Sequence, residues 1–162
     1  MYHRGSSRYA RVIYDMKYAR RPSLALSTLR QLVLTPDFLD FCRDVDAVVP
    51  VPTTWWRRWT RGYNPAALIA DIIAEACHRP SFPKALSRQW GARQSRTVGA
   101  QRTDLSRFTF SYSQLPVASG SHILLVDDVA TTGTTLTACA LALKRARPDL
   151  RISVFALAWA GR

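Results

Sequence analysis

Two adjacent carboxylates, Asp127 and Asp128, stand at the end of an apolar run and are followed at once by a threonine-rich turn. The stretch reads 123-ILLVDDVATTGTTL-136. Paired carboxylates can bind a metal ion, complete the magnesium site of an ATPase or accept hydrogen bonds from a sugar. The alternative without function is a solvated turn or an ordinary helix cap, because Asp is common at helix N-termini. The residues around the pair have to decide between these chemistries.

An ATPase site is excluded because the rest of the chain lacks the glycine-rich phosphate-binding loop of that class. An acidic strand end of that class works together with a GxxxxGK[ST] loop on an earlier strand. The lysines of this chain are Lys17, Lys84 and Lys144, and none of them stands in such a glycine-rich context. We therefore reject this interpretation.

A sugar-phosphate site fits the turn better. Carboxylates accept hydrogen bonds from the vicinal hydroxyls of a ribose, and a turn leading into a helix offers backbone N–H groups and hydroxyls to a phosphate. Gly133 permits backbone conformations that a Cβ would hinder. The turn consists of Ala130, Thr131, Thr132, Gly133, Thr134 and Thr135.

The composition indicates one globular domain. The chain has 162 residues, of which 48% are hydrophobic and 21% charged, and this suits one domain with a real core. No apolar run approaches the ~18–20 residues that a membrane helix needs, and the N-terminus lacks the apolar core of a signal peptide. We expect a cytoplasmic protein without membrane insertion. The scattered Cys42, Cys77 and Cys139 argue against a disulfide framework or a zinc ribbon.

The charge predicts an anionic partner. Lys and Arg total 23 against 11 Asp and Glu, which gives a formal charge of +12, and nearly all the cations are arginine. Arginine binds phosphate in forked, bidentate geometry. Polyphosphate metabolites and nucleic acid both fit, and the charge alone does not separate them.

The expected elements alternate between helix and strand. This alternation predicts parallel βαβ units in an open α/β sheet, with a helical segment 1–45 packed on a core of residues 46–162. Asn64 and Pro65 are placed as N-cap and first-turn residue of the second helix. We expect helices over 8–34, 66–78 and from Thr134 or Thr135 to Pro148, and strands over 46–52, 85–88, 122–127 and 151–159.

Three unusual segments fall where expected strands end, namely 52–64, 89–107 and 127–135. The segment 89–107 is polar and basic and has almost no aliphatic residues. In open α/β sheets, ligands bind beyond the carboxyl ends of the strands. We therefore expect these three segments to converge on one site.

The run 123-ILLVDDVATTGTT-135 resembles the phosphoribosyl pyrophosphate (PRPP) binding motif of type I phosphoribosyltransferases. The stretches 49-VPVP-52 and 61-RGYN-64, a basic stretch with Gln94 and Arg102, and 16-MKY-18 resemble the ComF family of phosphoribosyltransferase-like proteins. The resemblance covers roughly residues 10–160. The chain departs from the family pattern in having no CxxC pair, Pro65 in place of a glutamine, and Leu105 in place of an asparagine.

The resemblance implies a role for each segment. Asp127 and Asp128 would be the catalytic pair that engages the ribose hydroxyls, and 130–135 would hold the 5′-phosphate. Mg2+ would be carried by the ligand, with no direct protein ligand. The acceptor and a general base are not identified. Pyrophosphate would be bound by Arg57, Arg58 and Arg61, and a mobile loop would contribute Arg93, Gln94, Arg96 and Arg102.

A second interpretation rests on 55-WWRRWTRGY-63. Aromatic residues interleaved with arginine also stack on and neutralise single-stranded nucleic acid. The ComF resemblance implies a link to DNA uptake, so the alternative is a DNA-utilisation protein that binds single-stranded DNA, with a regulatory or vestigial PRPP site. A homodimer is a further candidate assembly.

Overall fold

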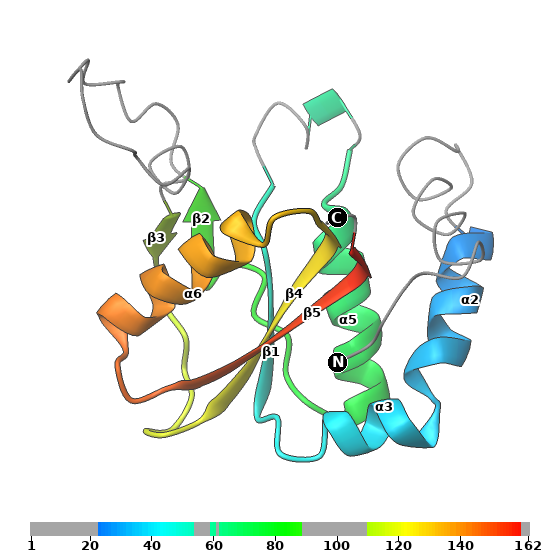
Figure 1. Cartoon of the computed structure of the whole chain (residues 1–162), viewed down its shortest axis with the longest axis horizontal. Helices are drawn as coiled ribbons and strands as arrows, with labels where there is room; N and C mark the ends of the chain where they lie inside the picture. The colour runs from blue at the N-terminus through cyan, green and yellow to red at the C-terminus, as the bar shows by residue number, and fades with distance from the viewer. Residues whose placement is uncertain (1–22, 54–58, 61, 89–109, 160–162) are drawn as a thin grey trace.

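The computed structural model describes residues 23–53, 59–60, 62–88 and 110–159. Its centre is a parallel sheet in the order β1–β4–β5, formed by β1 (Ala47–Pro50), β4 (His122–Ala130) and β5 (Arg151–Trp159) (Figure 1). Ala47 pairs with Ile123, and His122 pairs with Arg151. The parallel order confirms the expected open α/β sheet.

β1 is buried because it has neighbours on both sides. Besides its pairing with β4, its Val48 N–H donates to the Pro80 carbonyl at 2.9 Å, and its Val48 carbonyl accepts from Phe82 N–H at 2.9 Å. All four residues of β1 are buried. A strand enclosed in this way needs an apolar run without alternation, as the sequence 47-AVVP-50 provides.

One face of the sheet is covered by α2 (Ser23–Val33), α3 (Pro36–Phe41) and α5 (Pro65–Cys77), as Figure 1 shows. We call the apolar cluster between these helices and the sheet the α5-side core. Its buried members are Leu29, Val33, Phe38, Cys42, Val45, Val48, Ile69, Ala70, Ile72, Ile73, Ala74, Leu124, Val126 and Leu157.

The other face carries α6 (Thr134–Ala146) and an antiparallel hairpin of β2 (Leu86–Arg88) and β3 (Phe110–Tyr112). We call the cluster on this face the α6-side core. Its buried members are Ala47, Val49, Val51, Ala85, Leu86, Leu115, Ile123, Leu125, Ala130, Leu136, Cys139, Leu143 and Leu150.

β4 contributes side chains to both cores. Leu124 and Val126 belong to the α5-side core, whereas Ile123 and Leu125 belong to the α6-side core, and all four are 0% exposed. Successive side chains of a strand point to opposite faces. A central strand between two helical layers must therefore be apolar at every position, which explains the unbroken ILLV.

The structure differs from the sequence expectations in four places. β4 runs to Ala130, so Asp127 and Asp128 lie inside the strand, because pairing with β5 continues to Trp159. The short strand expected over 85–88 pairs antiparallel with β3, and neither β3 nor this antiparallel pairing was expected. The helix α3 was also not expected. The helix expected over 8–34 ends at Val33, and its first part, up to residue 22, lies outside the described residues.

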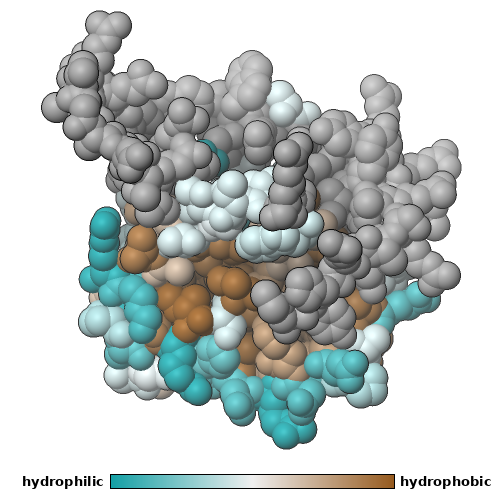
Figure 2. Space-filling model, in the orientation of Figure 1, coloured by the Kyte–Doolittle hydropathy of each residue, from teal (hydrophilic) through white to brown (hydrophobic). Residues whose placement is uncertain are grey.

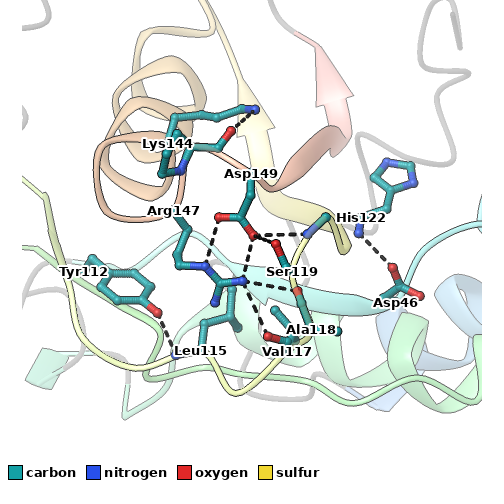
Figure 3. A network of polar contacts seen from close by, with 12 residues as sticks. Asp46, Tyr112, Leu115, Val117, Ala118, Ser119, His122, Lys144, Arg147 and Asp149 are labelled. Atoms are coloured by element: carbon teal, nitrogen blue, oxygen red, sulfur yellow. Dashed lines mark hydrogen bonds and ion pairs between the residues drawn. The ribbon is translucent and has the colours of Figure 1, made fainter.

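At the amino edge of the sheet, Arg147 and Asp149 clip the α6–β5 connection to the turn before β4 (Figure 3). The Arg147 guanidinium donates from Nε to Asp149 Oδ1 at 3.0 Å and from Nη2 to Oδ2 at 2.8 Å. It also donates to the Ala118 carbonyl at 3.2 Å, while Gly120 N–H donates to Asp149 Oδ2 at 3.1 Å. The hydrogen bonds from Arg147 have the largest effect on the pKa of Asp149, and the bond from Gly120 N–H has the next largest. Together they hold this pKa well below its usual range.

Figure 2 shows the molecular surface in the orientation of Figure 1. Hydrophobic residues lie at the middle of this surface, and hydrophilic residues lie along its lower rim. On β5 itself, Val154 is 50% exposed. In the part of the chain that the structure describes, no helix is both long and apolar enough to cross a membrane. The cytoplasmic location stays a prediction. So does the division of the chain into a helical segment 1–45 and a core of residues 46–162.

Candidate functional site

β4 extends beyond β1 at the carboxyl edge of the sheet. The last register pair between the two strands is Pro50 with Val126, and Val51 N–H donates to the Val126 carbonyl at 2.8 Å. Asp127 and Asp128 therefore lie past the end of β1 while β4 is still paired with β5. In a parallel sheet this is the edge at which ligands bind.

The acidic pair lies where the regular pattern of β4 is interrupted. Asp127 pairs in register with Ala156 of β5, and Val129 pairs with Ala158. The alternation of faces slips there: Val129 packs on the α5-side core and Ala130 belongs to the α6-side core, the reverse of what strict alternation gives.

Side-chain hydrogen bonds accompany this slip. Asp127 Oδ1 accepts from Asp128 N–H at 2.8 Å, and Asp128 Oδ1 accepts from Val129 N–H at 2.8 Å. Two consecutive backbone donors are thus satisfied by the carboxylates themselves. One oxygen of each carboxylate is fixed in place, which limits how each side chain can rotate.

Two charged side chains, Asp127 and Arg88, act electrostatically on the buried thiol of Cys139 in α6. Burial raises the pKa of the Cys139 thiol, the Asp127 carboxylate raises this pKa further, and Arg88 lowers it. Asp127 and Arg88 thus both act on the α6-side core near Cys139. Arg88 ends β2, and its Cζ is 5.9 Å from the centroid of the Phe110 ring. Arg88 was not predicted from the sequence, although it directly precedes the basic segment 89–107.

The threonine turn connects β4 to the N-terminus of α6. Gly133 is the N-cap residue of α6 with φ 75° and ψ −3°, a left-handed conformation that favours glycine. Thr132 Oγ1 and Thr134 Oγ1 are 2.7 Å apart, and Thr137 N–H donates to the Gly133 carbonyl at 2.9 Å. Gly133 has no side chain to cap the helix, but Thr132 Oγ1 accepts from the first-turn Thr134 N–H at 3.4 Å.

Trp159 bounds the turn on one side. A Cβ added to Gly133 would lie 3.3 Å from Trp159 Cη2, so the indole and the turn are in close contact. Trp159 pairs in register with Ala130 at the end of β5 and is 58% exposed. It was not predicted as a site residue. Its signal in the sequence is an aromatic residue ending the strand next to β4.

Asn64 closes the connection that follows β1. Its Nδ2 donates to the Val51 carbonyl at 3.0 Å, and its Oδ1 accepts from Ala66 N–H at 3.2 Å. One side chain thus ties the end of β1 to the start of α5, and Asn64 and Pro65 have the predicted N-terminal roles. Within this connection Trp59 is 67% exposed.

The predicted phosphate-turn residues and the acidic pair form one continuous unit from β4 into α6. Among the described residues, no group of three or more His, Cys, Asp or Glu side chains could hold a metal ion. The remaining predicted site residues lie outside the described part of the chain: Arg57, Arg58, Arg61, Arg93, Gln94, Arg96 and Arg102.

The sequence of the chain is similar to those of known proteins. Residues 60–161 match the family described as "Phosphoribosyl transferase domain". The chain is 29% identical over 139 residues to the DNA utilization protein YhgH of Escherichia coli K12, covering 83% of this chain and 60% of that protein. It is 33% identical over 110 residues to the competence protein ComFC of Bacillus subtilis, covering 68% and 43% respectively. Competence protein F of Haemophilus influenzae is 31% identical over 96 residues, covering 56% and 41%.

The structure combines a parallel sheet covered by helices on both faces with an acidic strand end and a threonine turn that leads into a helix. This combination is that of the phosphoribosyltransferase-like proteins. The chain belongs to the phosphoribosyl transferase domain family and, within it, to the ComF-type proteins. It spans about 60% of the length of the first of these relatives.

Proposed function

We propose that the protein binds PRPP with magnesium at the carboxyl end of β4. One observation carries the proposal: the acidic pair, the left-handed Gly133 and the N-terminus of the 13-residue α6 follow each other without interruption. Asp127 and Asp128 accept hydrogen bonds from the ribose hydroxyls. The turn 130–135 holds the 5′-phosphate through backbone N–H groups and threonine hydroxyls.

Magnesium is proposed to be carried by the ligand. Mg2+ prefers hard oxygen ligands and often takes them from substrate phosphates and water. The diphosphate and ribose oxygens of PRPP would hold the ion, while Asp127 and Asp128 accept hydrogen bonds from the ribose hydroxyls. When bound, Mg2+ supplies charge neutralisation on that diphosphate.

The reaction that this site supports is transfer of the phosphoribosyl group. An acceptor atom bonds to the anomeric carbon of the ribose while the bond from that carbon to pyrophosphate oxygen breaks. Positive charge develops on the sugar in this displacement, and the neighbouring carboxylates favour it electrostatically. Arg57, Arg58 and Arg61 are proposed to hold the pyrophosphate, and Arg93, Gln94, Arg96 and Arg102 to close over it. The acceptor is unassigned.

Titration calorimetry with PRPP tests the proposal. Wild-type protein should bind PRPP in the presence of Mg2+, and removal of the metal with EDTA should weaken binding. D127N/D128N should bind at least ~10-fold more weakly, since a charge-assisted hydrogen bond contributes about 1.5–3 kcal/mol. Asp37→Asn makes the same chemical change on exposed α3 and serves as the control. Absence of wild-type binding would overturn the proposal, and full binding by the double variant would overturn the assignment of the acids.

A second candidate function is binding of single-stranded DNA. Trp59 is 67% exposed and is flanked in sequence by Arg58 and Arg61, and the formal charge is +12. A relative carries the name DNA utilization protein. We propose that this connection stacks on bases and neutralises phosphates, with the PRPP site regulatory or vestigial. A homodimer stays a prediction.

Fluorescence anisotropy with a labelled single-stranded oligonucleotide tests this second function. Binding should weaken steeply with salt. Trp59→Ala should weaken binding by roughly 5–150-fold, as expected for loss of one base–aromatic stack. Arg30→Ala removes an exposed cation of α2 and should leave binding nearly unchanged. Weak binding at low salt, or equal effects of the two variants, would remove the claim.

A further inference from the structure

Trp159 contacts both ends of the segment 130–133. Its backbone is paired in register with Ala130, where the threonine turn begins. Its ring lies against Gly133, where α6 begins, because a Cβ added to Gly133 would be 3.3 Å from Trp159 Cη2. One residue of β5 thus joins the strand before the turn to the helix after it.

The indole contacts the backbone of the turn directly. Gly133 carries no side chain, and a Cβ at this position would be closer to the ring than an ordinary van der Waals contact. Gly133 also adopts φ 75°, a conformation that favours glycine. The glycine therefore serves both the shape of the turn and the close approach of the ring. Removal of the ring would free backbone rather than a neighbouring side chain.

The polar contacts within the turn involve groups that a phosphate would also use. Thr132 Oγ1 lies 2.7 Å from Thr134 Oγ1 and accepts from Thr134 N–H at 3.4 Å. A phosphate at this helix N-terminus would bond to the same kinds of group, namely N–H groups and hydroxyls. The ligand would therefore compete with these internal bonds. The contact with Trp159 is apolar and does not compete with the ligand.

We propose that Trp159 is a positioning residue of the phosphate turn: its ring holds the backbone at Gly133 in the conformation that binds the 5′-phosphate of PRPP. The inference rests on the proposed function, since the ligand is the one proposed for this site. A segment that is ordered in advance loses less conformational entropy on binding. Loss of order at one turn residue should weaken binding by roughly 5–30-fold, which is the equivalent of fixing the backbone of one residue.

Titration calorimetry with ribose 5-phosphate and with Mg2+–PRPP tests the effect on binding. Trp159 is 58% exposed, so Trp159→Ala should still fold. It should bind both ligands roughly 5–30-fold more weakly, and by the same factor, because the 5′-phosphate is common to both. Trp159→Phe keeps a ring at this position and should recover most of the affinity. Val154→Ala shortens an apolar side chain that is 50% exposed on the same strand and should bind like wild type.

Hydrogen exchange of the ligand-free protein, measured by NMR, tests the turn itself. Thr137 N–H donates to the Gly133 carbonyl at 2.9 Å, so its exchange rate reports on the position of Gly133. In Trp159→Ala this exchange should be faster by a similar factor, whereas Leu124 and Leu125 in the centre of β4 should keep wild-type rates. Val154→Ala should keep wild-type rates at all three amides.

The outcomes separate the positioning role from the proposed function. Absence of wild-type binding to either ligand would overturn the proposed function and the role in phosphate binding with it, and hydrogen exchange would still decide whether the ring orders the turn. With wild-type binding intact, an unchanged Thr137 rate in Trp159→Ala would overturn the positioning role alone. Undiminished affinity of Trp159→Ala, equal losses in Trp159→Phe, or faster exchange throughout β4 would also overturn it.

Discussion

At the residue scale, the acidic end of β4 departs from regular strand geometry where the ligand is proposed to bind. The N–H groups of Asp128 and Val129 bond to the carboxylates of the residues before them. The types of these residues, and that of Gly133, could be recognised from the sequence. The slip in alternation and the contact with Trp159 could not, because both depend on where β5 ends in space.

Gly133→Ala should destabilise the protein. A residue with a Cβ at φ 75° is strained by about 1–2 kcal/mol, and this Cβ would meet Trp159 Cη2 at 3.3 Å. The free energy of unfolding from urea titrations should fall by about that amount or more. In a Trp159→Ala background the same change should be less costly, because only the backbone strain remains. An equal cost in both backgrounds would show that the indole contact contributes nothing.

At the element scale, the boundaries that carry local signals agree with the sequence expectations. α5 begins at Pro65 after Asn64, and β5 covers Arg151–Trp159 as expected. α3 was missed because six residues give too little periodicity, and its Phe38 is fixed by a T-shaped ring contact with Phe155 at 5.3 Å. The three-residue strands β2 and β3 likewise owe their pairing to tertiary contacts rather than to propensity.

Asn64→Ala should loosen the start of α5. It removes both the N-cap acceptor and the bond to the Val51 carbonyl, and we expect the free energy of unfolding to fall by about 1–2 kcal/mol. Asn64→Asp keeps a capping acceptor but no donor, so its loss should be smaller. Denaturant titrations of the three proteins measure this order. Equal losses for both variants would mean that the cap contributes little.

The Arg147–Asp149 clip should make stability depend on pH. The folded-state pKa of Asp149 lies below the ordinary value of 3.8, so its contribution is present above about pH 4 and is lost as the pH falls further. Asp149→Asn should lower the urea midpoint at pH 7, and its difference from wild type should shrink at pH 3. Asp37→Asn removes one carboxylate without the clip. A difference that stays constant between the two pH values would contradict this account.

At the scale of the whole molecule, one sheet separates two apolar cores, and β4 contributes side chains to both. The fold class followed from alternating helical and strand patterns together with the all-apolar ILLV run. The packing of 89–107 could not be predicted, since a polar segment without periodicity specifies no unique packing. Arg88, which directly precedes that segment at the end of β2, was not predicted as a site residue.

Leu29→Ala and Leu143→Ala should destabilise the same cooperative unit from opposite faces. Both side chains are nearly or fully buried, at 1% and 0% exposed, in the α5-side and α6-side cores respectively. Each change should lower the free energy of unfolding by about 2–5 kcal/mol, and each variant should show one unfolding transition by calorimetry. Leu34→Ala, at a residue that is 60% exposed, is the control. Two separate transitions, with only one shifted in each variant, would mean that the cores unfold independently.

The double hydrogen bond of Asn64 has an evolutionary consequence. Because one side chain fastens both ends of the connection from Val51 to Asn64, changes of length between these anchors need not reach the sheet. Doubling the length of a flexible loop adds only about 0.6 kcal/mol of closure entropy. This connection can therefore change in length and sequence while the scaffold stays the same.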